Sequence, residues 1–129
     1  MTNKKNMIIP LLLLLLTLTL LPTTIASADL SKNTTLEMNG VKFDVPLSNN
    51  NTTNEYKEQG STWAYEDYEH GISVYVCTQR PSEYSPNEQF NSATGTYEQL
   101  TPLGDKWVVV CAESADEKDF VWKSLRLVE

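Results

Sequence analysis

The stretch LEMNGVKFDVP, residues 36–46, sets the fold class more firmly than any other part of the chain. Apolar and polar residues alternate on both sides of Asn39-Gly40, as they do in strands that bury one face. Asn-Gly adopts the positive φ angles of a two-residue type I′ turn with little strain. The stretch therefore predicts a β-hairpin whose second strand is closed by Pro46.

Beyond this hairpin, four more segments have the alternating pattern of strands. They pair around turns at 67–71 and 102–105, which contain Gly and Asp. The four segments are residues 62–66, 72–77, 97–100 and 106–111. Residues 47–60 are polar and include the run NNNTTN at 49–54, so we expect a loop there because the segment has no apolar face to bury.

Two capping boxes predict helices. The sequence SPNE at 85–88 predicts a short helix to about Ala93, and SADE at 114–117 predicts a last helix. The residues that would share a face of this last helix are Val121, Leu125 and Val128. Leu125 and Leu127 also alternate, so an extended end is the alternative. Together the segments predict an α+β domain, an antiparallel β-sheet of about six strands with one or two helices packed on one face.

Four stretches of this chain resemble the PsbP-like α/β/α sandwich superfamily. They are VKFDVP at 41–46, the hairpin before a capped helix, KWVVVCAES at 106–114 and FVWKSL at 120–125. The similarity covers residues 36–127 and is one of pattern. It implies a binding or assembly subunit rather than an enzyme, and it transfers no site residue to this chain.

The first 28 residues have the three parts of a secretory signal peptide. Two lysines are followed by an apolar run at 7–21 and by Ala26-Ser27-Ala28, small residues suited to cleavage before Asp29. The run is shorter than the roughly 20 residues of a membrane helix, so we expect a secreted or extracytoplasmic protein, with an uncleaved N-terminal anchor as the alternative. The expected organisation is a signal peptide at 1–28, a flexible segment at 29–35 and a single small domain at 36–129.

The net negative charge of the chain limits the classes of partner that it can bind. Residues 1–28 contain two lysines and no acid, so cleavage changes the net charge from −7 to −9. Such an acidic surface disfavours nucleic acid and anionic membranes. We expect no membrane insertion after cleavage and an extracellular or envelope protein or ligand as the partner, while charge that serves solubility alone stays open. Candidate glycosylation sites, in a host that modifies exported chains, are Asn33, Asn50 and Asn51.

Cys77 and Cys111 are the two cysteines of the chain. Exported proteins meet oxidising conditions, and a domain this small gains much of its stability from one cross-link. We therefore expect a disulfide between Cys77 and Cys111, with two buried free thiols as the alternative.

No catalytic or cofactor motif is present in the sequence. His70 is the single histidine, and its place in a turn predicts a solvated side chain. Neither paired-cysteine nor paired-histidine spacing for a metal occurs, and the acids near His70 and at 116–119 are explained by solvation and by the helix dipole. The expectation is a binding or assembly module without catalytic residue, metal or cofactor, with a purely structural domain or a small enzyme as alternatives.

The predicted strands also indicate where a partner would bind. Period-two alternation places Tyr75 on the face of its strand that lacks the valines, and it places Trp107 on the corresponding face of the strand at 106–111. We expect this face to be the binding surface, with Trp63 and Tyr65 as neighbours. The alternative is that the Asn/Thr segment or the chain ends cover it.

Overall fold

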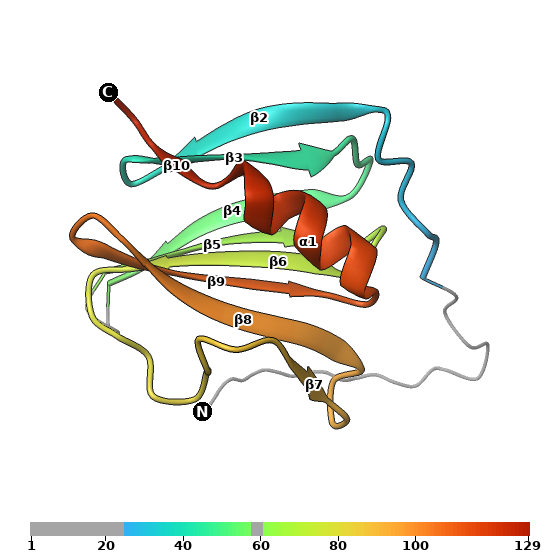
Figure 1. Ribbon diagram of the computed structural model, residues 1–129. Coiled ribbons are helices and arrows are strands. Elements are labelled where there is room, and N and C mark those ends of the chain that lie inside the picture. The colour runs from blue at the N-terminus through green and yellow to red at the C-terminus, as the bar shows by residue number, and fades with distance from the viewer. Residues whose placement is uncertain (1–24, 58–60) are drawn as a thin grey trace.

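The computed structural model describes residues 25–57 and 61–129, which form nine strands and one helix (Figure 1). The strands are β2 (Asn33–Met38), β3 (Val41–Pro46), β4 (Asn51–Tyr56), β5 (Thr62–Asp67), β6 (Ile72–Cys77), β7 (Gln89–Asn91), β8 (Thr96–Leu103), β9 (Lys106–Ala112) and β10 (Arg126–Leu127), and the helix is α1 (Ala115–Ser124). Six strands make an antiparallel sheet in the order β4-β5-β6-β9-β8-β7, and three make a second sheet in the order β10-β3-β2. Most of the predicted signal peptide, residues 1–24, lies outside the described residues.

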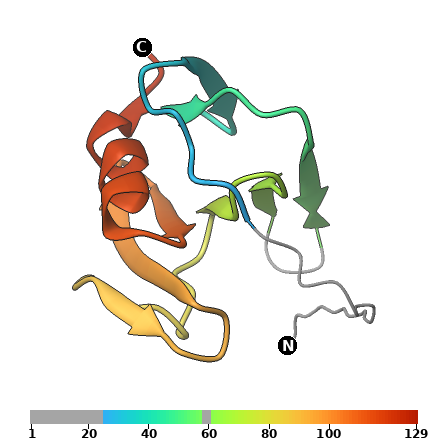
Figure 2. The same ribbon diagram turned by 90° about the vertical axis from the view of Figure 1, so that its right-hand side faces the viewer.

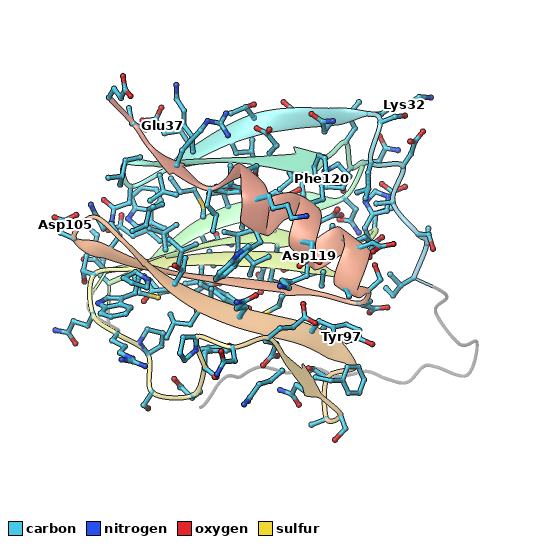
Figure 3. All side chains as sticks on the ribbon, in the orientation of Figure 1. Lys32, Glu37, Tyr97, Asp105, Asp119 and Phe120 are labelled. Carbon is cyan, nitrogen blue, oxygen red and sulfur yellow. The ribbon has the colours of Figure 1, made fainter. Side chains whose placement is uncertain are left out.

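The core lies between two layers. The three-stranded sheet and α1 lie side by side over one face of the six-stranded sheet, here called the core face (Figures 1 and 2). Side chains from both layers fill the space between them (Figure 3). Buried members of this core include Phe43, Val45, Val74, Val76, Val108, Val110 and Val121. Valine dominates because its branched side chain packs well on a pleated sheet.

The predicted fold class is confirmed in its coarser part. The described residues contain an antiparallel sheet of six strands with a helix over one face, but the protein is mainly β and this part of the chain has a single helix. The sequence did not indicate that the first hairpin forms a sheet of its own. That sheet is completed by β10, whose Leu127 lies opposite Val41 of β3.

The hairpin at β2 and β3 forms as predicted. Asn39 and Gly40 have φ angles of 47° and 85°, which is the backbone that a type I′ turn requires. β2 begins at Asn33, three residues before the predicted Leu36, because Asn33 pairs with Pro46 in the register of the hairpin. Part of the segment expected to be flexible at 29–35 is therefore strand.

The loop predicted at 47–60 is wrong, because residues 51–56 form strand β4 at the edge of the large sheet. All six residues of β4 are exposed, and an edge strand needs no apolar face when its backbone pairs with a neighbour. The polar segment is also anchored at its start. The N–H of Asn49 donates to Oε1 of Glu69 over 2.7 Å, and the N–H of Tyr68 donates to the carbonyl of Asn50 over 2.8 Å.

The helix predicted at 85–93 is also wrong. Residues 89–91 form strand β7, which pairs with β8. Two tertiary contacts outweigh the capping signal: the rings of Phe90 and Tyr97 pack across the two strands with centroids 5.0 Å apart, and the Glu88 carboxylate binds Nζ of Lys118 over 2.7 Å. Local propensity is a weak guide where such contacts compete with it.

The last predicted helix is confirmed. Oγ of Ser114 accepts a hydrogen bond from the N–H of Glu117 over 3.1 Å, which is the expected cap of α1. The helix ends at Ser124, and Leu125 is extended. The alternative of an extended end is therefore the one that the structure adopts, because these residues pair with β3.

Candidate functional site

The face of the six-stranded sheet that is turned away from α1 carries the two residues expected at the centre of a binding surface. Tyr75 lies opposite Val109, and Cys77 lies opposite Trp107, in the register of β6 and β9. Directly opposed residues of an antiparallel pair point to the same face. Tyr75 and Trp107 therefore share a face.

Trp63 and Tyr65 lie on the core face instead. Each is opposite a core valine of β6, and both pack into the core between the layers. Tyr65 is fully buried, with its ring centroid 6.0 Å from that of Phe43. Burial, with a further contribution from the Asp67 carboxylate, raises the pKa of Tyr65 to about 12. These two aromatics stabilise the core and are not neighbours of the expected surface.

The neighbours of Tyr75 are other tyrosines. In the register of the sheet, Tyr56 of β4 lies opposite Thr62 of β5, and Tyr75 of β6 lies opposite Ala64 of β5. Thr62 and Ala64 are two residues apart on one strand and so point to the same face. Tyr56 and Tyr75 therefore share that face. Two more tyrosines from turns and loops interact electrostatically with this pair. We call this side of the sheet the tyrosine face, and its four tyrosines are Tyr56, Tyr68, Tyr75 and Tyr84.

One end of the tyrosine face is open to solvent. Tyr68 is 50% exposed and Tyr56 is 43% exposed, and both lie beside Glu66. The Tyr68 hydroxyl donates to Oε1 of Glu66 over 2.9 Å. Partial burial and this carboxylate raise the pKa of both tyrosines, so both hydroxyls are protonated donors at neutral pH. Sequence reasoning missed both residues because it placed them in a loop and a turn.

The other end of the face is partly covered. The loop at 78–88 brings Tyr84 against Leu100 and Val109, and it places the Arg80 guanidinium 5.2 Å from the centre of the Trp107 ring. Burial raises the pKa of Tyr84 far above its usual value. Within residues 25–57 and 61–129, the cover at this end comes from this loop.

Cys77 and Cys111 are free thiols, so the predicted disulfide is wrong. Cys77 lies opposite Trp107 and Cys111 lies opposite Ser73, which leaves them four residues apart in register. At about 3.3 Å per residue that is about 13 Å, whereas a disulfide needs Cα atoms about 4.4–6.8 Å apart. Both cysteines lie near the end of their strand, but neighbouring antiparallel strands run in opposite directions. Their final residues therefore lie at opposite ends of the strand pair. Burial raises the pKa of both thiols, which keeps them neutral and unreactive.

His70 is buried, contrary to the expectation of a solvated turn residue. Its Nδ1 lies 2.7 Å from Oδ2 of Asp67, an arrangement that also orients a catalytic base. The Asp67 carboxylate has further donors, however: the Ser48 hydroxyl at 2.6 Å and the Glu69 N–H at 3.0 Å. The pair fastens the turn between β5 and β6 to the chain before β4.

A pocket of about 140 Å³ lies beside His70, at the beginning of α1. Its polar lining comes from His70, Glu113, Ser114 and Glu117, and residues 25–27 close one side of it. The Ser114 hydroxyl is engaged as the cap of α1, which leaves the pocket without an activated nucleophile among these residues. The arrangement suits the binding of a hydrogen-bond donor or a cation rather than acyl transfer.

The three glycosylation candidates lie at the beginnings of edge strands. Asn33 starts β2, Asn51 starts β4 and Asn50 precedes it, and all three are exposed. Their side chains are accessible to modification.

Residues 25–57 and 61–129 contain no group of three or more His, Cys, Asp or Glu side chains arranged to hold a metal ion. They also contain no helix of the length and apolar character needed to span a membrane.

Comparison of the chain with protein-family models, with curated proteins and with solved structures gives no match.

Proposed function

We propose that this chain is an exported, non-enzymatic binding module that contacts its partner through the open end of the tyrosine face. The observation that carries the proposal is the exposure of Tyr56 and Tyr68, both of which interact with Glu66, at one edge of the sheet. Large aromatic side chains that lie this open on a small domain are a feature of contact surfaces.

The chemistry of this surface suits protein recognition. A tyrosine ring offers a wide apolar area and loses little conformational entropy on contact, and its hydroxyl provides a hydrogen bond. The buried Ala64 shares this face with Tyr56 and Tyr75. Glu66 adds one negative charge that interacts with both Tyr56 and Tyr68.

The partner that fits this surface is a protein with a basic, flat patch at the cell exterior. The net charge of −9 after cleavage favours approach by a basic surface and opposes nucleic acid and anionic lipid. Export rests on the signal-like residues 1–28. The pattern shared with PsbP-like chains supports the same assignment of a binding or assembly subunit.

The test compares loss of the two exposed tyrosines with loss of an exposed aromatic ring on the other face of the sheet. The folded chain is immobilised, the envelope fraction of the native host is passed over it, and captured proteins are quantified by mass spectrometry. Tyr56→Ala with Tyr68→Ala should lower capture of the specific partner at least tenfold, since exposed aromatic anchors contribute about 1–2 kcal/mol each.

The matched control is Phe90→Ala. Phe90 is 56% exposed but lies on the core-face side of the sheet, opposite Tyr97, so its loss should leave capture unchanged. Equal capture by the wild-type chain and the double tyrosine variant would reject the tyrosine face as the binding surface.

A further inference from the structure

Titratable side chains from two parts of the chain converge at the beginning of α1. His70 comes from the turn after β5, Glu113 follows β9, and Glu117 belongs to the first turn of the helix. Glu113 packs directly over Gly71: a Cβ at Gly71 would lie 2.8 Å from Oε2 of Glu113. Desolvation and the nearby Glu117 raise the pKa of Glu113.

A segment of the chain itself occupies this site. The N–H of Ala28 donates to Oε2 of Glu117 over 2.8 Å, and the N–H of Ala26 donates to the carbonyl of Glu69 over 3.3 Å. Residues 25–27 thus line one side of the pocket, and the backbone of this segment offers neutral N–H donors to its rim.

Glu117 depends on this segment. The residue is only 6% exposed, and of the residues that the structure describes, Ala28 is the one that donates to its carboxylate. The ion pairs of Lys106, Lys118 and Arg126 are made with other acids. If the chain is cut after Ala28, a buried carboxylate aimed into the pocket loses its donor, which is costly unless another donor takes its place.

We infer that this pocket binds the α-ammonium group that signal cleavage creates at Asp29, through the carboxylate of Glu117. The inference rests on the proposed export of the chain. The nitrogen of Asp29 follows that of Ala28 by one peptide unit, and consecutive Cα atoms are about 3.8 Å apart, so the new terminus needs to move by about one residue. A hydrogen bond in which only the acceptor is charged is then replaced by one in which both partners are charged, which is stronger.

The chain after the cleavage point is already shaped for this contact. The Asp29 carboxylate accepts from the N–H of Ser31 over 3.0 Å, and the N–H of Lys32 donates to the Asp29 carbonyl over 3.1 Å. This turn leads directly into β2. A preorganised turn lowers the entropy that binding of the terminus would otherwise cost.

Binding of the ammonium group makes its pKa an observable. The titratable groups around it are the Glu117 and Glu113 carboxylates from the helix side, the His70 ring from the turn and the Asp29 carboxylate of its own residue. A carboxylate in contact with an amine raises the pKa of the amine. The α-amino pKa should therefore lie about one unit above its ordinary value of about 7.7–8.0. The resulting stabilisation is present below that ordinary pKa and is lost as the pH rises through the raised one.

The experiment cuts the full chain in vitro, which separates this inference from export. The substitutions Ala26→Glu, Ser27→Gly and Ala28→Arg place a factor Xa site, Ile-Glu-Gly-Arg, before Asp29, so that cleavage of the purified chain releases the Asp29 terminus. The α-amino pKa is then measured from the pH dependence of its NMR signals. We expect a raised pKa in the cut chain and a value in the ordinary range in the cut chain with Glu117→Gln.

Two further variants serve as controls. Asp116→Asn removes an equal charge from the same first turn of α1 but from an exposed position, and it should leave the α-amino pKa raised. Where Glu117→Gln fails to fold, a cut that leaves five inserted glycines before Asp29 places the ammonium group well beyond the position of the Ala28 N–H, and its pKa should lie in the ordinary range. An unshifted α-amino pKa in the cut wild-type sequence, or an equal value in all cut chains, would overturn the inference. Export is judged separately from the intact mass of secreted material.

Discussion

Nδ1 of His70 lies 2.7 Å from Oδ2 of Asp67, and both side chains are buried. This pair joins the two ends of the turn between β5 and β6, and through Ser48 it also holds the chain that leads into β4. The relationship places the single histidine in a structural role and makes it a sensitive point of the fold.

Removal of the Asp67 carboxylate should destabilise the domain strongly. Asp67→Ala leaves the donors of His70, Ser48 and Glu69 without their acceptor in a buried site, so we expect the free energy of unfolding to fall by about 3–5 kcal/mol in urea denaturation. The control is Asp105→Ala, at an 87% exposed side chain on the turn between β8 and β9 (Figure 3), which should change stability by less than about 0.5 kcal/mol. Equal effects of the two substitutions would contradict the role given to the pair.

Both cysteines should react as free thiols after unfolding. Mass spectrometry after labelling with a thiol reagent should show two labels on the unfolded, unreduced chain and almost none on the folded chain, because Cys77 and Cys111 are buried. A chain that takes up no label until a reductant is added would show that the register of β6 and β9 differs from the one described here.

Trp107→Ala should have an intermediate effect on stability. Its ring is partly buried against Leu100 and Val109 under Arg80, so we expect a loss of about 2 kcal/mol, below the roughly 3–5 kcal/mol of a fully buried tryptophan. Arg80→Ala should lose about 0.5–1 kcal/mol through the cation–π contact. Urea unfolding followed by circular dichroism measures both, and a Trp107→Ala loss near zero would mean that the loop at 78–88 does not cover this end of the face.

Gly71→Ala should cost more than Gly95→Ala. Both glycines have positive φ angles, 70° and 75°, so both substitutions strain the backbone by about 1 kcal/mol. Only at Gly71 does the new methyl group also meet the Glu113 side chain, whereas nothing lies within 4 Å at Gly95. Combining Gly71→Ala with Glu113→Ala should remove the difference, and purely additive losses would show that the two residues do not touch.

The buried tyrosines should delay alkaline titration of the folded protein. The pKa of Tyr65 is raised to about 12, so the unfolded chain releases its proton first, and the stability from this group is present below about pH 10 and lost as the pH rises through 12. Tyrosinate absorbance at about pH 11 should therefore stay below that of six ionised tyrosines and reach the full value only together with unfolding. Smooth titration of all six tyrosines near pH 10 in a folded chain would contradict the burial of Tyr65.

The strands that bury one face could be predicted from the sequence, whereas the edge strands β4 and β7 could not. Alternating apolar residues indicated β3, β6 and β9 correctly because burial imposes a period of two on the sequence. β4 lacks this signal since all its side chains are exposed, and β7 is fixed by a contact between Phe90 and Tyr97, seven residues apart. Register is equally invisible to periodicity, which is why the disulfide prediction failed and why Trp63 and Tyr65 were assigned to the wrong side.

Of the tyrosine face, only the central residues Tyr75 and Trp107 could be predicted from the sequence. Tyr75 and Trp107 share a face because both belong to strands whose period was clear. Tyr56 and Tyr68 come from segments whose structure depends on pairing with a distant partner, so no local pattern placed them there. The burial of His70 likewise follows from its contact with Asp67 and the chain before β4, which a turn-based interpretation does not contain.

The position of α1 and β10 in the chain sets an order for folding during synthesis. Val121 completes the core between the layers, and Leu127 pairs with Val41 in the first hairpin, yet both are made after every strand of the large sheet. A nascent chain that has not reached α1 therefore has only the first hairpin to cover the valines of the core face. Such a chain cannot complete its core until synthesis has passed Val121.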